Sequence, residues 1–164
     1  MQLLQKKVAL TLIILLALQV SYGQKVTRDV GSFNGVNLSL SANMYLTQGS
    51  TSSVVIEGSQ EAIDHIETKV RDGVLIIKQD EDWKWWKNWN NKNVRIYITN
   101  PSFEQVSVSG SGNIKGENTL QERSMDIGVS GSGKINLAIK TVELASKISG
   151  SGNMNIQGTA RSTN

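Results

Sequence analysis

Three near-copies of one short phrase constrain the fold of this chain more than any other feature. They read Val-Ser-Gly-Ser-Gly-Asn at 108–113, Val-Ser-Gly-Ser-Gly-Lys at 129–134 and Ile-Ser-Gly-Ser-Gly-Asn at 148–153. Their spacing of about 20 residues is typical of one coil in a stacked repeat protein. Because such a unit cannot bury its apolar side alone, each copy is expected to stack on its neighbours.

Residues 36–47 form the cleanest pattern, with apolar and polar residues in strict alternation. This alternation predicts an extended strand with one buried face and one wet face. The stretch is also a degenerate fourth copy of the phrase, in which Leu40 and Ala42 occupy the two glycine positions. We therefore expect the glycines of the other copies to face inward at the corner of a coil, and the serine between them to face outward. A flexible Gly/Ser linker is the competing interpretation.

Further strands are predicted at 54–57, 74–78 and 94–99, which are rich in β-branched residues and bounded by turn residues. Residues 60–70 fit either one helical turn or a strand. We predict an all-β fold, a right-handed parallel β-helix-like solenoid with coils of about 20 residues. A tryptophan-rich loop or hairpin is expected to project from it. The polar tail from Gly158 stops in mid-pattern, which suggests either truncation or pairing of the open coil end with a partner.

The N-terminal residues predict export. Lys6 and Lys7 precede an apolar run at 8–20, and Ser-Tyr-Gly at 21–23 supplies small residues before a cleavage point. We predict a signal peptide at 1–23 and a single domain at 24–164. An uncleaved membrane anchor is the alternative, although the apolar run is short for a bilayer.

Composition narrows the class of protein. Removing the predicted signal peptide removes two lysines, so the formal net charge falls from +3 to +1. A charge this small lacks the bulk basic character of a nucleic-acid-binding protein. The chain has no cysteine, which excludes a disulfide framework. Stability must then come from apolar burial and backbone hydrogen bonds.

All four tryptophans lie within one segment, interleaved with lysines and asparagines: Trp83, Trp85, Trp86 and Trp89. Exposed aromatic side chains beside amide and ammonium groups suit stacking on sugars, contact with a membrane interface or binding of a protein partner. The alternatives are that some of these side chains pin the loop to the body of the protein, or that they make contacts between copies of the chain.

The sequence shows no catalytic or metal centre, and no cofactor is predicted. His65 is the single histidine, with no cysteine or second histidine to complete a zinc site. The acidic triplet at 80–82 lacks the alternate spacing of a calcium loop and fits a solvated turn. An enzyme of the polysaccharide lyase or hydrolase kind on a β-helix needs clustered acids or bases on one face, and none is visible.

Several segments together resemble one bacterial family. These are Arg-Asp-Val-Gly-Ser-Phe-Asn-Gly-Val at 28–36, Val-Arg-Asp-Gly-Val-Leu-Ile-Ile at 70–77, and Asn-Pro-Ser-Phe at 100–103 leading into the Ser-Gly-Ser-Gly phrases. The chain is similar to the head GIN domain family of putative auto-transporter adhesins. The resemblance implies a β-helix-like fold, export to the envelope or surface of a Gram-negative bacterium, and an adhesive role. It brings no catalytic residues. The tryptophan-rich insert and the early end of the repeats depart from the family's pattern.

We therefore expect an exported, non-catalytic adhesin or interaction module that binds glycan or a surface protein through the tryptophan loop. It would be peripheral to a membrane at most, would bind no nucleic acid, and could self-associate through the open coil end. Its location would be the periplasm, the outer membrane surface or the extracellular space. A β-helix carbohydrate-active enzyme is the rival interpretation, and a purely structural envelope module is a third.

Overall fold

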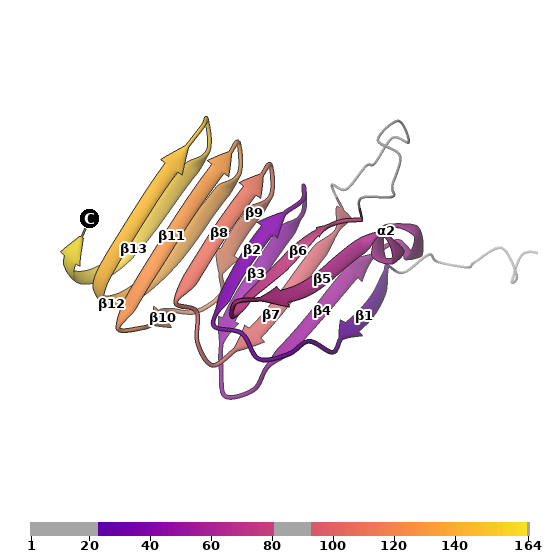
Figure 1. The fold of residues 1–164 in the computed structure, drawn as a ribbon, viewed down its shortest axis with the longest axis horizontal. Coiled ribbons are helices and arrows are strands. Elements are labelled where there is room, and N and C mark those ends of the chain that lie inside the picture. The colour runs from indigo at the N-terminus through magenta and orange to yellow at the C-terminus, as the bar shows by residue number, and fades with distance from the viewer. Residues whose placement is uncertain (1–22, 81–92, 164) are drawn as a thin grey trace, which may run out of the picture.

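The computed structural model describes residues 23–80 and 93–163. Within them the chain is almost entirely β-structure, with one short helix (Figure 1). The strands and the helix are β1 Gln24–Arg28, β2 Gly35–Ser39, β3 Asn43–Gln48, β4 Ser53–Gly58, α2 Gln60–Asp64, β5 Ile66–Arg71, β6 Val74–Gln79, β7 Arg95–Asn100, β8 Gln105–Gly110, β9 Asn113–Gly116, β10 Leu120–Gln121, β11 Ser124–Gly131, β12 Lys134–Ser149 and β13 Asn153–Thr163.

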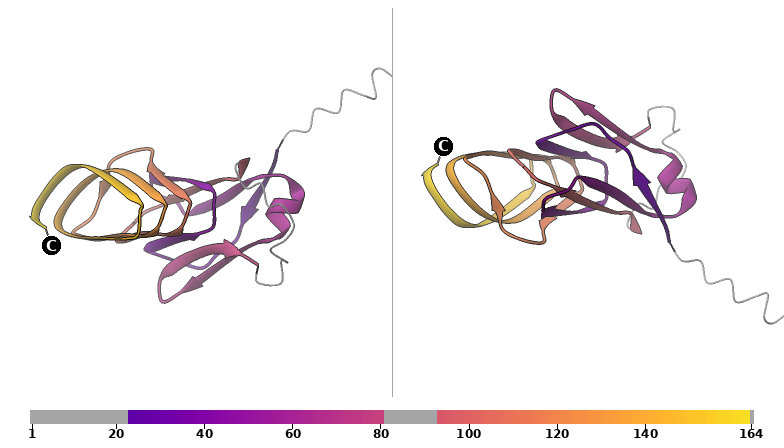
Figure 2. Two further views of the ribbon diagram at one scale, coloured as in Figure 1. Left: turned by 90° about the horizontal axis from the view of Figure 1, so that it is seen from above. Right: turned by 90° about the horizontal axis from the view of Figure 1, so that it is seen from below.

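All thirteen strands belong to one hydrogen-bonded sheet, whose order is β1-β4-β7-β3-β9-β12-β11-β8-β2-β6-β5, with β10 and β13 joined to β12. The sheet folds over at β12, whose beginning pairs with β9 and whose end pairs with β11. Seen from above and below, the sheet forms two facing walls (Figure 2). We call the wall that contains β3, β7 and β9 the β3 wall, and the wall that contains β2, β8 and β11 the β2 wall.

The prediction of a right-handed parallel β-helix-like solenoid is wrong. The sheet is mixed and curls into a nearly closed barrel, in which β4 runs antiparallel to both β1 and β7, and β5 runs antiparallel to β6. The repeat spacing governs register only where parallel strands adjoin, as where Val129 pairs with Val108 and with Ile148.

Local turn chemistry explains one of the antiparallel pairs. Asp72 and Gly73 connect β5 to β6 with φ angles of 51° and 77°. Positive φ at both central residues of a two-residue turn folds the chain back as a hairpin, and Asp-Gly is a favoured sequence for it. The antiparallel pairs of β4 have a different origin. The chain turns back after β3 to form β4, but β7 lies between these two strands, so β4 pairs with β7 and with β1.

The predicted strands are confirmed except at 36–47, where the chain bends at 40–42 and forms two strands, β2 and β3. Strands form at 53–58, 74–79 and 95–100, and the open choice at 60–70 resolves into the helix α2 followed by β5. The second glycine of the phrase is buried at Gly112 and Gly133, and Ser111 and Ser132 are exposed, as the alternation predicts. The first glycine, also expected to face inward, is not buried: Gly110 and Gly131 are only partly covered. A Cβ atom at Gly133 would lie only 2.3 Å from the Cγ1 of Val108 and 2.8 Å from the carbonyl oxygen of Gly112 in the preceding corner, so this corner has no room for a side chain.

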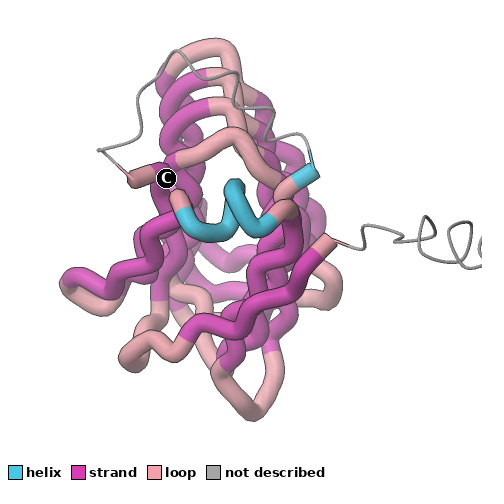
Figure 3. Tube along the Cα trace, turned by 90° about the vertical axis from the view of Figure 1, so that its right-hand side faces the viewer, coloured by secondary structure: helices cyan, strands magenta, loops and turns pink. Residues whose placement is uncertain are grey.

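The core lies between the two walls and is aliphatic, with Phe33 and Phe103 the only aromatic side chains among its buried described residues. Helix α2 lies across one end of the barrel (Figure 3). It begins where Ser59 Oγ accepts a hydrogen bond from the Ala62 amide, and it places Ile63 in the core. At the opposite end Ile148 is exposed, and Met154 and Ile156 are partly buried against the core.

Candidate functional site

The predicted contact residues Trp83, Trp85, Trp86 and Trp89 lie outside the described residues, as do two members of the acidic triplet, Glu81 and Asp82. Asp80, the last described residue before this segment, donates its backbone amide to the carbonyl oxygen of His65 at 2.9 Å. The segment therefore connects the end of β6 on the β2 wall to the start of β7 on the β3 wall.

The outer surface of the β3 wall carries a row of polar and aromatic side chains that sequence analysis did not assemble. In-register pairing aligns Tyr97 with Tyr45, then with Lys115, Asn136 and Asn155 on successive strands. A second row beside it brings Asn43 next to Asn113. We call the outward residues Asn43, Tyr45, Tyr97, Asn113, Asn136 and Asn155 the amide–tyrosine face.

The two tyrosine rings of this face stack on one another. Their centroids are 5.2 Å apart, with an interplanar angle of 17°. Lys25 Nζ lies 5.8 Å from the Tyr97 ring centroid, which gives that ring a cation–π neighbour. Partial burial, and then the nearby Glu57 carboxylate, raise the pKa of Tyr97 above its ordinary value. The phenol therefore stays a neutral donor and acceptor throughout the physiological range.

Amide pairs continue the face away from the tyrosines. Asn113 Nδ2 donates to Asn43 Oδ1 at 3.0 Å, and Asn155 Nδ2 donates to Asn136 Oδ1 at 3.2 Å. Each pair leaves further amide hydrogens and lone pairs pointing to solvent. Lys115 lies between them, and its hydrogen bond to Glu117 raises its pKa. A flat, rigid array of such groups can bind a polyhydroxylated surface by many weak hydrogen bonds.

The β2 wall presents a plainer surface of small residues. Ser109, Ser130 and Ser149 align in register across β8, β11 and β12. Beside them Gly128 leaves a shallow depression of about 340 Å³, which Lys147 also lines. Asn37 Nδ2 already donates to the hydroxyls of Ser107 and Ser109, so part of this surface is engaged internally.

No catalytic constellation appears among residues 23–80 and 93–163, and these residues contain no group of three or more His, Cys, Asp and Glu that could hold a metal ion. His65 caps the C-terminus of α2. Asp126 pairs in register with Gln105 and Ala145, neither of which is a carboxylate.

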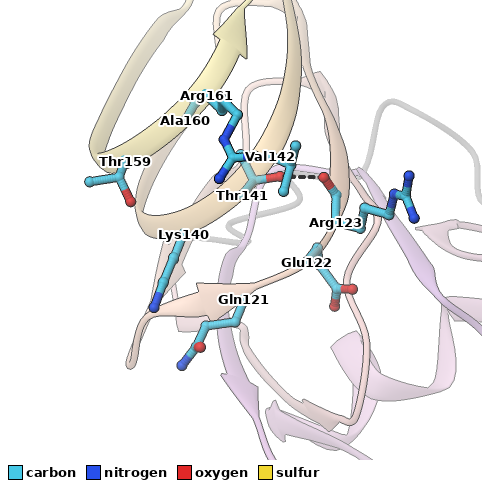
Figure 4. Close-up of a pocket in the computed structure, with 9 residues that line it drawn as sticks. All are labelled: Gln121, Glu122, Arg123, Lys140, Thr141, Val142, Thr159, Ala160 and Arg161. Carbon is cyan, nitrogen blue, oxygen red and sulfur yellow. Dashed lines mark hydrogen bonds between the residues drawn. The ribbon is translucent and has the colours of Figure 1, made fainter.

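A groove of about 670 Å³ lies at the corner where β12 and β13 pass from one wall to the other. We call it the corner groove; it is lined by Gln121, Glu122, Arg123, Lys140, Thr141, Val142, Thr159, Ala160 and Arg161 (Figure 4). Thr141 Oγ1 donates at this corner to the carbonyl oxygen of Arg123 at 3.1 Å.

Sequence reasoning missed both the tyrosine pair and the corner groove. Tyr45 and Tyr97 both stand at outward positions of predicted strands, but nothing local shows that β3 and β7 are neighbours. Part of the groove could have been predicted, because the repeat spacing places Lys140 in register with Gln121 and Thr159. None of the helices formed by the described residues has the length and apolar character needed to cross a membrane.

The chain is similar to known putative adhesins in both sequence and structure. The family model described as "Putative auto-transporter adhesin, head GIN domain" matches residues 32–164. No curated protein matches the chain significantly. The structure resembles that of a putative adhesin from Bacteroides fragilis, with a TM-score of 0.75 and 26% identity over 85% of this chain and 65% of that one.

Two further structures share the fold at lower identity. A putative lipid binding protein from Parabacteroides distasonis has a TM-score of 0.70 and 20% identity, over 85% of this chain and 61% of that one. A putative adhesin from Parabacteroides merdae has a TM-score of 0.70 and 16% identity, over 84% of this chain and 57% of that one. The chain thus spans less than two thirds of the length of each of these three proteins.

Proposed function

Because this chain belongs to the family of putative auto-transporter adhesins with a head GIN domain, we propose that it is an exported adhesion module that binds glycans without catalysing a reaction. The family itself indicates an adhesin-like role and an exported or surface location. Glycan as the ligand, the contact surface and the cleaved signal peptide at 1–23 are proposals.

The amide–tyrosine face is the observation that carries the proposal. Sugars present hydroxyl groups that both donate and accept, and an array of asparagine side chains matches them with donors and acceptors. The tyrosine edges add apolar area with a polar tip. Because these side chains stand on paired strands and not on a loop, their spacing is fixed before a ligand arrives, which reduces the entropic cost of binding.

The tryptophan segment is proposed as a second contact. It joins β6 to β7, and β7 carries Tyr97 of the amide–tyrosine face. Aromatic side chains interleaved with lysine and asparagine are suited to stacking against sugar rings. The segment leads directly into β7, the strand of the β3 wall that carries Tyr97.

Tryptophan fluorescence tests this proposal directly, since Trp83, Trp85, Trp86 and Trp89 are the only tryptophans and all lie in one segment. The chain from Gln24 onward would be titrated with a panel of envelope and host glycans, and acrylamide quenching recorded at each step. We expect quenching to fall and emission to shift to the blue with one glycan class. Tryptophans that respond to no member of the panel would exclude the segment as a glycan contact.

A further inference from the structure

We propose that the corner groove binds the carboxylate or sulfate groups of an acidic polysaccharide, through Lys140 and Arg161. This inference rests on the proposed glycan-binding function and assigns to it a ligand class and a second, charged subsite.

Strand register concentrates the basic side chains at this corner. Lys140 pairs in register with Gln121 on one side and with Thr159 on the other. The next residue along, Thr141, pairs with Ala160 and faces inward, so Val142 and Arg161 are the next outward neighbours. Figure 4 shows Lys140 and Arg161 on adjoining strands, with Arg123 on the other side of Val142 and directed away from both.

The lining carries three basic side chains and one carboxylate, so its formal charge is +2. Among the described residues no ion pair involves Arg123, Lys140 or Arg161. The single acidic residue of the lining, Glu122, is already engaged, since its Oε1 accepts the Phe103 amide at 2.7 Å and the Gln48 amide nitrogen at 2.9 Å. Cations without partners on a concave surface favour an anionic ligand.

The rest of the lining favours a polysaccharide over a lipid surface as the source of the anion. Gln121 and Thr159 flank Lys140 with an amide and a hydroxyl, which can bind sugar hydroxyl groups. The apolar side chains of the lining are Val142 and Ala160 alone. Membrane-surface binding normally adds an apolar anchor to the basic charge, and the described lining offers none of that size.

The test compares binding of alginate oligosaccharides and dextran sulfate with binding of uncharged dextran. The variant Lys140→Gln/Arg161→Gln should weaken acidic-glycan binding about tenfold, because it removes two charge-assisted contacts. The matched control Lys69→Gln/Arg71→Gln removes one lysine and one arginine from exposed positions on β5, and its affinity should change less than about twofold. The swap Lys140→Arg/Arg161→Lys keeps the charge and should retain binding.

Three results would overturn the inference. One is unchanged alginate and dextran sulfate affinity in the Lys140→Gln/Arg161→Gln variant when its thermal unfolding matches that of the parent. Another is an equal loss in the control variant, which would mean a general charge effect. The third is tighter binding to phosphatidylglycerol vesicles than to any acidic glycan.

The same assay separates this inference from the proposed function. If neutral glycans bind and the groove variant leaves acidic-glycan binding intact, only the corner groove is wrong. If the chain binds no glycan, neutral or acidic, both proposals fail together.

Discussion

The Tyr45 and Tyr97 rings stack at 5.2 Å on neighbouring strands β3 and β7, although the two residues lie far apart in the sequence. Such a pair contributes about 0.5–1.5 kcal/mol beyond the apolar area that it buries. The contact exists only because β7 returns to pair with β3 and not with β6, which precedes it. The tyrosine pair therefore marks the strand order that makes this sheet a mixed barrel.

The titration of Tyr97 is the first prediction. Its pKa is raised above 10.0 by partial burial and then by Glu57, so Glu57→Gln should lower that pKa part of the way back. A tyrosine with a raised folded pKa favours folding below its unfolded pKa, and this contribution is lost as pH rises through the folded pKa. Stability should therefore fall above about pH 10.

Ultraviolet absorbance of tyrosinate measures this in a Tyr45→Phe background, where Tyr97 is the single tyrosine of the chain from Gln24 onward. Lys69→Gln, a charge change far along the sheet on β5, serves as the control. A Tyr97 pKa that does not move on Glu57→Gln would contradict the assigned electrostatic cause.

Glycine at 133 should be irreplaceable. A Cβ there would lie 2.3 Å from Val108 Cγ1 and 2.8 Å from the Gly112 carbonyl oxygen. Gly133→Ala should cost about 1–3 kcal/mol in the free energy of unfolding, measured in urea. The matched control is Gly128→Ala, because a Cβ at 128 meets only Ser107 Cβ at 3.8 Å. Equal effects from the two substitutions would show that the corner at Gly133 is not packed as closely as described.

Asn100 is the buried polar residue that ties the ends of several strands together. Its Nδ2 donates to the carbonyl oxygens of Phe33 and Ser102 at 2.9 and 2.7 Å, and its Oδ1 accepts from Ser52 Oγ at 2.6 Å. Asn100→Ala should cost about 2–3 kcal/mol, since it leaves two buried acceptors unpaired. Ser52→Ala removes one bond alone and should cost about 1 kcal/mol. A lower urea midpoint with an unchanged slope is expected for both variants. An Asn100→Ala variant with the same unfolding free energy as the parent would contradict the stabilising role of the Asn100 hydrogen bonds.

Gln48 should hold the segment that precedes β11. Its Nε2 donates to the Gln121 carbonyl oxygen at 3.1 Å, and its Oε1 accepts the Gln121 amide at 2.6 Å. Asn118 Oδ1 accepts the backbone amide of Gln48 at 2.9 Å. Gln48→Ala should speed amide exchange at 118–122 about fivefold or more, equivalent to roughly 1 kcal/mol of local stability. Gln157→Ala, exposed on β13, should leave that exchange unchanged; protection that persists in Gln48→Ala would count against this role.

The strands and corners could be predicted because their signals are local. Alternation at 36–47 predicts extended backbone and its buried side, though not the break between β2 and β3. The degenerate copy aligns correctly, since Asn43 pairs with Asn113 and Met44 with Ile114. Asp72-Gly73 is likewise a hairpin signal in the sequence. Interpreting it only as a turn misses the reversal that its two positive φ angles produce.

The strand order and the outer face could not be predicted because they depend on pairing between distant segments. The strands of the repeats pair in parallel, and assuming parallel pairing for the whole chain leads to the incorrect prediction of a solenoid. Nothing near β4 shows that β7 will lie between it and β3. Without the strand order, the neighbours of Tyr97 cannot be predicted, and so the residues of the amide–tyrosine face cannot be grouped on one surface.

The most direct test of the glycan-binding account compares two matched variants on a glycan array. Asn113→Ala/Asn136→Ala/Asn155→Ala removes three exposed amides from the β3 wall, and Ser109→Ala/Ser130→Ala/Ser149→Ala removes three exposed hydroxyls from the β2 wall. We expect the asparagine variant to lose neutral-glycan binding by about tenfold, at about 0.5 kcal/mol or more per hydrogen bond, while the serine variant binds as the parent does. Equal binding by both variants, or a loss confined to the serine variant, would contradict the account.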